Sequence, residues 1–447
     1  MNHWRETIVV AAPIALALLS EIGMGLISTA MLGQAGDLAL AAGGFGTNVF
    51  ITILLVLQGL LSGVGVLAAN RLGAGVAAEV PQLYWSGVAL AALLAIPMFA
   101  LLSQDATIWV AVGQPADLAR DVAAYLHILR WGVPAGVVGI GMMRQFLPAI
   151  GRQLLLVWVM PAGLVLHAGL NLALVPRYGL AGSAWAIVIT LSATAFTLLA
   201  LLHAGSPRLV RWRRPQAAAL RPLLAIGLPV SVTVAVEAGL FLATGILAGV
   251  LGPTALAAHT IALSVVSVSF MVPLAVSQAA NVLVAAFQGA RDMAASRQAG
   301  FAAILLSLAF MATSACVLSL MPHTIVALYL PPSPATAATA ALAANLLRIA
   351  GFFQLADGTQ VTAAGALRGL QDVRVPMLMA SFGYWGIGFW AGWALAFPAH
   401  LGVVGLWWGL CAGLAVVAAS LLWRFARRSA LQDSFTRTPD LTGAGAS

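Results

Sequence analysis

The chain contains 447 residues, of which 62% are hydrophobic and 8% are charged, whereas a soluble domain carries roughly 25% charged residues. This composition excludes a water-soluble globular fold. The formal net charge of +8 comes from 21 basic residues, all arginine, and arginines that flank apolar runs indicate membrane topology rather than a nucleic-acid partner.

The predicted elements are twelve membrane-spanning helices, because apolar runs of about 20 residues match a hydrocarbon core of ~30 Å. A helix also satisfies its own backbone hydrogen bonds. The first run is too long for a signal peptide and contains Glu21, so we assign it to helix one. In chain order the spans cover roughly 8–32, 43–69, 83–103, 122–147, 154–175, 180–202, 223–250, 257–286, 300–321, 340–367, 376–397 and 402–424.

The second half of the chain repeats the first. A shift of 216 positions places Glu21 on Glu237 and Gly36 on Gly252, and the segment ALAA recurs after each glycine. Six spans therefore correspond in order to the other six. Because six is even, both halves enter the membrane in the same orientation, which makes this a parallel repeat with its axis along the membrane normal.

The repeat predicts an all-α membrane protein of two six-helix lobes. The N-terminal lobe covers residues 1–205, an arginine-rich cytoplasmic linker covers 206–221, and the C-terminal lobe with a short cytoplasmic tail covers 222–447. Transporters built from such repeats bind substrate between the halves and rock one half against the other. Prolines inside the spans, such as Pro134, either kink a helix or are simply tolerated there.

Arginines orient the predicted spans, since cytoplasmic loops retain positive charge. Five lie in or near the linker and three follow the last span, so an even number of spans leaves both termini in the cytoplasm. These residues are Arg208, Arg211, Arg213, Arg214, Arg221, Arg424, Arg427 and Arg428.

Three carboxylates lie deep within predicted spans: Glu21, Glu237 and Asp357. An acidic residue at the centre of a membrane helix costs about 2.5 to 3.5 kcal/mol on insertion scales. Arginines on the same helix are too distant to neutralise Asp357, because Arg348 and Arg368 lie ~13 and ~16 Å away along the axis. Pairing with another helix or permanent protonation stays open. The alternative is that these groups exchange a proton or a small cation such as Na⁺.

The repeat is asymmetric at these carboxylates. Glu21 matches Glu237, whereas Asp357 falls opposite Gly139 when the later spans are aligned. A buried carboxyl group close to a second one can load and release a proton, and a cationic substrate competes for the same negative charge. We therefore expect the coupling site in the second half.

Several segments also resemble the multidrug and toxic compound extrusion (MATE) transporters, most closely the NorM-like bacterial branch. They are GMGLISTAMLG at 23–33, NLALVP at 171–176, GLPVSVTVAVEAGLF at 227–241, GPTALAAHTIAL at 252–263 and FFQLADGTQVTAAGALRGLQD at 352–372. The resemblance implies a twelve-helix, two-lobed exporter that expels cationic drugs in exchange for Na⁺ or H⁺.

The resemblance also implies roles for individual residues. Glu237 and Asp357 match acidic residues that family members use for cation coupling, and they are the candidate Na⁺ ligands. NorM-like members usually carry Asp where this chain has Ser28. This departure means that the resemblance does not extend to a first-lobe cation site at Ser28. Glu21, seven residues upstream and about 10 Å along the helix, is the candidate substitute.

For other polar residues in the spans, two interpretations are open. Gln278, Asn281, Gln354 and Gln360 either reach substrate or hydrogen-bond between helices, and the second role is commoner. His259 either joins a proton pathway or is a satisfied core residue, and we prefer the core role.

The sequence therefore predicts a multidrug and organic-cation antiporter of the bacterial inner membrane, monomeric, with lipids and small amphipathic or cationic drugs as partners and no cofactor except its coupling ion. No Gly-x-x-x-x-Gly-Lys phosphate loop is present, so no ATPase or other enzyme activity is expected. The main alternative is a flippase for lipid-linked precursors, whose cavities need several basic groups, whereas the deep groups here are acidic. An uncoupled channel or a membrane sensor is a third possibility.

Overall fold

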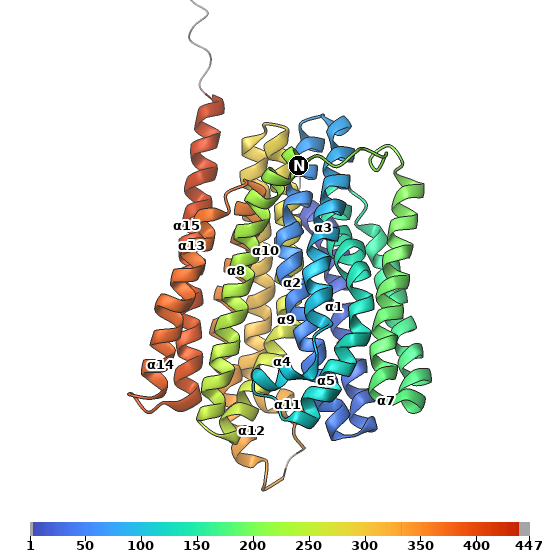
Figure 1. Cartoon of the computed structure of the whole chain (residues 1–447). Coiled ribbons are helices and arrows are strands. Elements are labelled where there is room, and N and C mark those ends of the chain that lie inside the picture. Colours follow the sequence, from blue (N-terminus) through green and yellow to red (C-terminus); the bar gives the residue numbers. More distant parts are fainter. Residues whose placement is uncertain (1–2, 332, 438–447) are drawn as a thin grey trace, which may run out of the picture. The chain divides into compact units, whose positions relative to one another are not determined.

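The computed structural model describes residues 3–331 and 333–437, with side chains described as far as residue 431. The end of the predicted cytoplasmic tail, residues 438–447, lies outside the described residues. All secondary structure in the described ranges is helical (Figure 1).

The helices follow one another with short connections. In the first half they are α1 (His3–Ala35), α2 (Asp37–Gly73), η1 (Ala77–Glu79), α3 (Val80–Leu102), α4 (Ala106–Ala111), α5 (Ala116–Leu129), η2 (Arg130–Gly132), η3 (Ala135–Gly141), α6 (Met142–Ala149) and α7 (Leu154–Gly205). In the second half they are α8 (Ala217–Val250), α9 (Pro253–Gly289), α10 (Met293–Leu320), α11 (Pro322–Ala327), α12 (Ala337–Gly369), α13 (Arg374–Ser381), η4 (Phe382–Phe389), α14 (Trp390–Ala396) and α15 (Gly402–Arg437).

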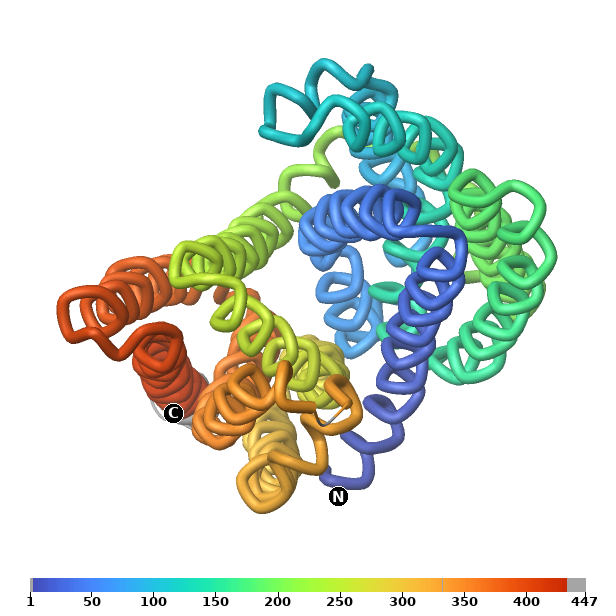
Figure 2. The backbone as a smooth tube through the Cα atoms, turned by 90° about the horizontal axis from the view of Figure 1, so that it is seen from below, coloured from blue at the N-terminus to red at the C-terminus, as the bar shows by residue number. Residues whose placement is uncertain are grey.

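The long helix α7 is two spans joined at a turn. Gly179 has φ +53° and ψ −127°, which is not helical. In a continuous helix Thr190 would lie ~34 Å from His167, yet the Oγ1 atom of Thr190 lies 3.3 Å from Nδ1 of His167. The chain therefore turns back on itself within the green segment of Figures 1 and 2.

The described residues contain all twelve predicted spans. Nine helices are long and apolar enough to cross a membrane, and a bent pair, Ala116–Gly132 with Ala135–Ala149, makes a tenth. Dividing α7 at Gly179 adds one span. The consecutive segments α13, η4 and α14 supply the last, which is irregular because its middle, Phe382–Phe389, is a π-helix.

The fourth span bends by 46° where Pro134 separates its two parts. The second part opens with a π-helix, Ala135–Gly141. Proline lacks the backbone N–H and collides with the preceding turn, so a kink at this position has an identifiable cause. Pro134 is thus one of the prolines that bends its helix.

Backbone geometry repeats in the two halves as the sequence predicts. Gly36 and its counterpart Gly252 have φ values of +120° and +112°, a left-handed conformation that glycine adopts without strain. Both end the turn between corresponding spans. The following helices, α2 and α9, are each 37 residues long and end at Gly73 and Gly289.

The contacts divide the chain into two compact units. The N-terminal unit consists of residues 13–72 and 76–234, and the C-terminal unit consists of 1–12, 73–75 and 235–447. In the N-terminal unit α7 packs against α5 and η3. In the C-terminal unit α12 contacts α9, α10 and α15, and α14 and α15 run side by side at the red end of the chain in Figures 1 and 2.

Candidate functional site

Two carboxyl groups on different helices come together in the C-terminal unit. Glu237 on α8 and Asp357 on α12 each accept a hydrogen bond from Nε2 of Gln360, and both nitrogen-to-oxygen distances are 3.3 Å. Asp357 and Gln360 are each 3% exposed, whereas Glu237 is half-buried. We call Glu237, Asp357 and Gln360 the carboxyl cluster.

The spacing on α12 explains part of this geometry. Asp357 and Gln360 are three residues apart, so they lie on the same face of the helix. One amide group therefore reaches its own helix neighbour and a carboxylate on α8 at the same time. The two acids that sequence predicts for cation coupling are thus brought together, and Gln360 is part of the same group.

The π-helix η4 places Tyr384 next to the carboxyl cluster. Tyr384 is fully buried and close enough to Glu237 and Asp357 to interact electrostatically with both. Its neighbour Trp385 donates its indole N–H to the carbonyl oxygen of Val236 at 3.0 Å. π-Helical turns are often found at functional sites. Tyr384 was not predicted as a site residue, because the pattern of apolar residues in the sequence does not indicate a π-helix.

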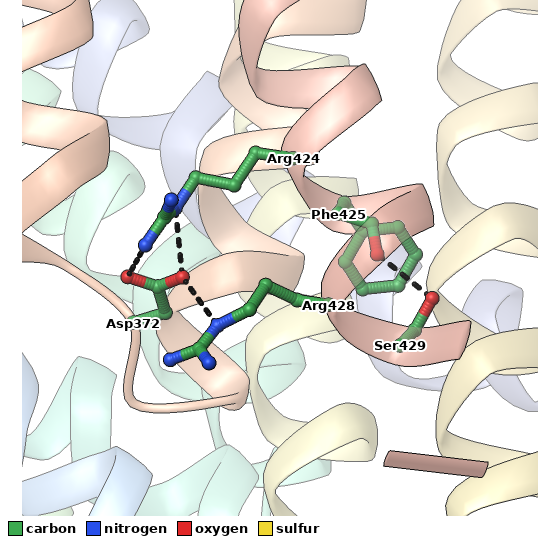
Figure 3. A network of polar contacts seen from close by, with 5 residues as sticks. All are labelled: Asp372, Arg424, Phe425, Arg428 and Ser429. Carbon is green, nitrogen blue, oxygen red and sulfur yellow. Dashed lines mark hydrogen bonds and ion pairs between the residues drawn. The ribbon is translucent and has the colours of Figure 1, made fainter. Parts of the chain in front are cut away.

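Arginine does not neutralise the carboxyl cluster within its own unit. In the described part of the C-terminal unit, the ion pairs of acidic residues involve Glu6 and Asp372. Asp372 lies just after α12 and binds Arg424 of α15 through both carboxylate oxygens, at 2.8 and 3.0 Å, while Arg428 donates to it at 3.2 Å (Figure 3). Arg424 and Arg428 of α15 thus pair with Asp372, just beyond the end of α12, and not with the acids of the carboxyl cluster.

The remaining predicted polar residues of the C-terminal unit lie on α9 and α12. Gln354 is buried and donates from Nε2 to Oγ of Ser269 at 2.6 Å, which joins α12 to α9. His259 is buried with its ring 5.9 Å from the ring of Trp407, edge to face. Gln278 and Asn281 are also buried on α9. The hydrogen bond of Gln354 ties two helices. The ring of His259 packs in the core, but its buried Nδ1 has no hydrogen-bond partner among the described residues, so the hydrogen bond expected for a core role is not found there.

Glu21 in the N-terminal unit is ion-paired. Nη1 of Arg144 donates to both carboxylate oxygens, each at 2.7 Å. The Arg144 side chain is 4% exposed and the Glu21 side chain 35%. Arg144 belongs to α6, so the partner comes from another helix, one of the alternatives that the sequence left open. The expectation that the deep charged groups are all acidic is therefore wrong.

Ser28 takes part in a buried hydrogen-bond network. Its Oγ atom lies 2.9 Å from Nε2 of His167, the amide of Asn171 lies 3.0 Å from the same nitrogen, and Thr190 lies on the other side of the ring. All four residues are buried. A neutral hydrogen-bonded group thus occupies the position where the resemblance described above implies an Asp.

The carboxyl cluster can hold a proton or a hard cation. Two carboxyl groups supply oxygen ligands, which hard cations prefer, while the amide of Gln360 faces them with its donor nitrogen. Among the described side chains of residues 3–331 and 333–431, no group of three or more His, Cys, Asp or Glu could hold a metal ion. The donor set fits H⁺ or Na⁺ as an exchanged ion.

Comparison with known proteins gives consistent matches. The MatE family model matches residues 13–173 and 229–394. A protein named "Probable multidrug resistance protein NorM" from Burkholderia mallei (strain ATCC 23344) is 50% identical over 438 residues, covering 96% of this chain and 94% of its own length. A protein of the same name from Rhizobium meliloti (strain 1021) is 34% identical, covering 95% of this chain and 94% of its own length.

Solved structures share the fold. The structure titled "Crystal structure of eukaryotic MATE transporter AtDTX14" superposes with a TM-score of 0.87 at 19% identity and covers 97% of this chain and 99% of its own. One titled "Outward-facing conformation of a multidrug resistance MATE family transporter of the MOP superfamily" superposes with a TM-score of 0.88 at 18% identity, covering 97% of each chain.

Proposed function

Since this chain belongs to the MATE family of membrane transporters, as a NorM-like member, we propose that it exports drugs in exchange for H⁺ or Na⁺ entering down its gradient. The multidrug resistance names of its relatives support a substrate class of small amphipathic or cationic molecules. A family of transporters also agrees with the expectation that the chain is not an enzyme.

The carboxyl cluster is the single observation that carries the proposal of ion coupling. Glu237 and Asp357 share one amide donor, Gln360, and no arginine in the described part of their own unit forms an ion pair with either. Deep ionisable groups in membrane spans are retained where they carry ions or protons, because their burial is otherwise unfavourable. A drug cation and a coupling ion therefore compete for the same two carboxyl groups.

Competition of this kind produces antiport when it is combined with alternating access. The ion neutralises the cluster and lowers its affinity for the cationic drug, which then leaves on the outer side. The parallel repeat supports movement of one half against the other as the step that changes access. We place the protein in the bacterial inner membrane with both termini in the cytoplasm, acting as a monomer surrounded by lipid.

Polar residues away from the cluster have structural roles in this proposal. Gln354 and His259 hold α9, α12 and α15 together through Ser269 and Trp407. Substitution of Gln354 is therefore a control for substitution of Gln360, because both are buried glutamines on α12.

Everted membrane vesicles test the proposal. We expect uptake of the drug into the vesicle lumen when a proton gradient or a sodium gradient is imposed alone, with only one of the two gradients effective. Glu237→Gln and Asp357→Asn should each reduce gradient-driven transport to the background of vesicles without the protein, while the amounts of inserted protein stay equal. Transport that continues in both variants at the wild-type rate contradicts the assignment of the cluster.

A further inference from the structure

We propose that Arg144 holds Glu21 in a permanent ion pair, so that the N-terminal unit takes no part in ion exchange and coupling is confined to the C-terminal unit. Arg144 acts here as a positioning residue through its charge. The inference rests on the proposed function, because it specifies which of the two repeated halves carries the coupling ion.

The geometry of the pair favours a fixed charge on Glu21. One guanidinium nitrogen donates to both carboxylate oxygens at 2.7 Å, and charge-assisted hydrogen bonds of this length are the strong ones. The guanidinium group cannot lose its proton in a protein. Since Arg144 is almost fully buried, protonation of Glu21 would leave a buried cation without its counter-charge, which is unfavourable.

The equivalent carboxylate in the other half has a neutral partner. Glu237, the repeat counterpart of Glu21, accepts a hydrogen bond from the uncharged amide of Gln360. In the alignment of the later spans, which is offset by 218 positions, Arg144 corresponds to Thr362. A buried arginine is therefore found in the first half, and the uncharged Thr362 takes its place in the second half. The neutral amide of Gln360 is compatible with either a charged or a protonated carboxyl group on Glu237.

The N-terminal unit also lacks space for the second acid. Gly139 corresponds to Asp357 and lies in the π-helix η3. A Cβ atom added at Gly139 would collide with the Cβ of Ala195 on α7 and lie 3.2 Å from its Cα. At this place the N-terminal unit therefore has one carboxylate, Glu21, paired with a cation. The corresponding place in the described C-terminal unit has two carboxyl groups, Glu237 and Asp357, that share a neutral amide.

Other titratable side chains near α1 do not supply a replacement. His167 on α7 faces Ser28, seven residues along α1 from Glu21, and its ring is surrounded by neutral hydrogen-bonding groups, Ser28, Thr190 and Asn171. The charged group that faces Glu21 itself is Arg144 of α6. Arg144 is thus the charged partner of Glu21 among the described residues.

Infrared difference spectroscopy on the purified full-length protein tests this directly, because a protonated carboxyl group has a carbonyl band that a carboxylate lacks. In spectra recorded between high and low pH, the wild type and the doubly neutral Glu21→Gln/Arg144→Met variant should give the same carboxyl bands, while Glu237→Gln and Asp357→Asn should each lose one. Arg144→Met alone should gain a band, and Arg144→Lys should resemble the wild type.

Loss of a wild-type carboxyl band in the doubly neutral variant would overturn the inference, because Glu21 would then titrate in the native protein. The doubly neutral variant removes both charges together, so it avoids the buried unpaired charge of either single variant. A second readout is the pH profile of drug flux, which should be unchanged in the doubly neutral variant and altered in Arg144→Met. An unaltered profile in Arg144→Met, with the variant folded, also contradicts the inference. If the wild type shows no ion-driven drug flux, the proposed function fails, and the spectra still decide the pairing.

Discussion

Glu237 and Asp357 lie 120 residues apart in the sequence, on α8 and α12, and accept hydrogen bonds from the same amide nitrogen of Gln360. The bridge fixes the two acids within reach of one ion. Substitutions around this bridge provide the first predictions.

Gln360→Ala should impair ion-driven drug transport more than it impairs folding. Hydrogen bonds to charged groups contribute ~1.5–3 kcal/mol, and the donor of Gln360 favours the charged carboxylates. We therefore expect its loss to change the apparent affinity for the coupling ion by roughly 10- to 100-fold, with tighter binding where the ion is H⁺. Initial rates of drug efflux measured against ion concentration report this change. Gln354→Ala removes a buried glutamine of the same helix that binds Ser269 instead, and its ion dependence should stay at the wild-type value.

Tyr384→Phe should change the ion dependence of transport while leaving the amount of inserted protein unchanged. The substitution removes one buried hydroxyl near Glu237 and Asp357 and keeps the ring that packs in the core. We expect a change of severalfold, smaller than that of Gln360→Ala, because the hydroxyl group interacts without holding the two acids together. Equal ion dependence in Tyr384→Phe and wild type would exclude the hydroxyl from the site.

The ion pairs after α12 should stabilise the fold to different degrees (Figure 3). Arg424→Met removes a mostly buried partner that binds both oxygens of Asp372, and breaking a buried pair costs about 3–5 kcal/mol. Arg428→Met is its matched control, because Arg428 is 52% exposed and exposed pairs contribute about 0–1 kcal/mol. Thermal unfolding in detergent should show a clear decrease in Tm for Arg424→Met and little change for Arg428→Met. A reversed order would contradict this assignment.

Gly139→Ala should destabilise the N-terminal unit. The added methyl group meets Ala195 on α7, and overpacking of this kind costs typically 1–3 kcal/mol. Gly25→Ala on α1 provides the control, because a Cβ at Gly25 has no atom within 4 Å and alanine favours helix. Folded yield and Tm compare the two variants, and equal stability would show that the packing at Gly139 has room for a side chain.

Much of the fold was predictable because hydropathy depends on local composition. The twelve spans follow from apolar runs, and the repeat follows from residues such as Gly36 and Gly252, whose turns require a left-handed backbone. The pairing of Glu21 with Arg144 was not predictable in the same way. The two residues are 123 positions apart, and only the structure shows that the buried arginine of α6 meets the carboxylate of α1.

The site shows the same division between local and long-range information. Asp357 and Glu237 were singled out by their depth in predicted spans, whereas Gln360 was named only as one of several polar residues of the spans. The face that it shares with Asp357 was described only with the structure. The π-helix that carries Tyr384 has no signal in the period of apolar residues, so its contribution was missed. Arg144 did have a signal, since it is a charge inside a predicted span, like the three carboxylates.

Uphill drug transport by proteoliposomes that contain the Glu237→Gln/Asp357→Asn double variant tests the central claim most directly. With an imposed proton or sodium gradient, the wild type should concentrate the drug against its own gradient, and the double variant should only let it equilibrate. Accumulation by the double variant to the wild-type level would show that ion coupling does not depend on these two carboxyl groups.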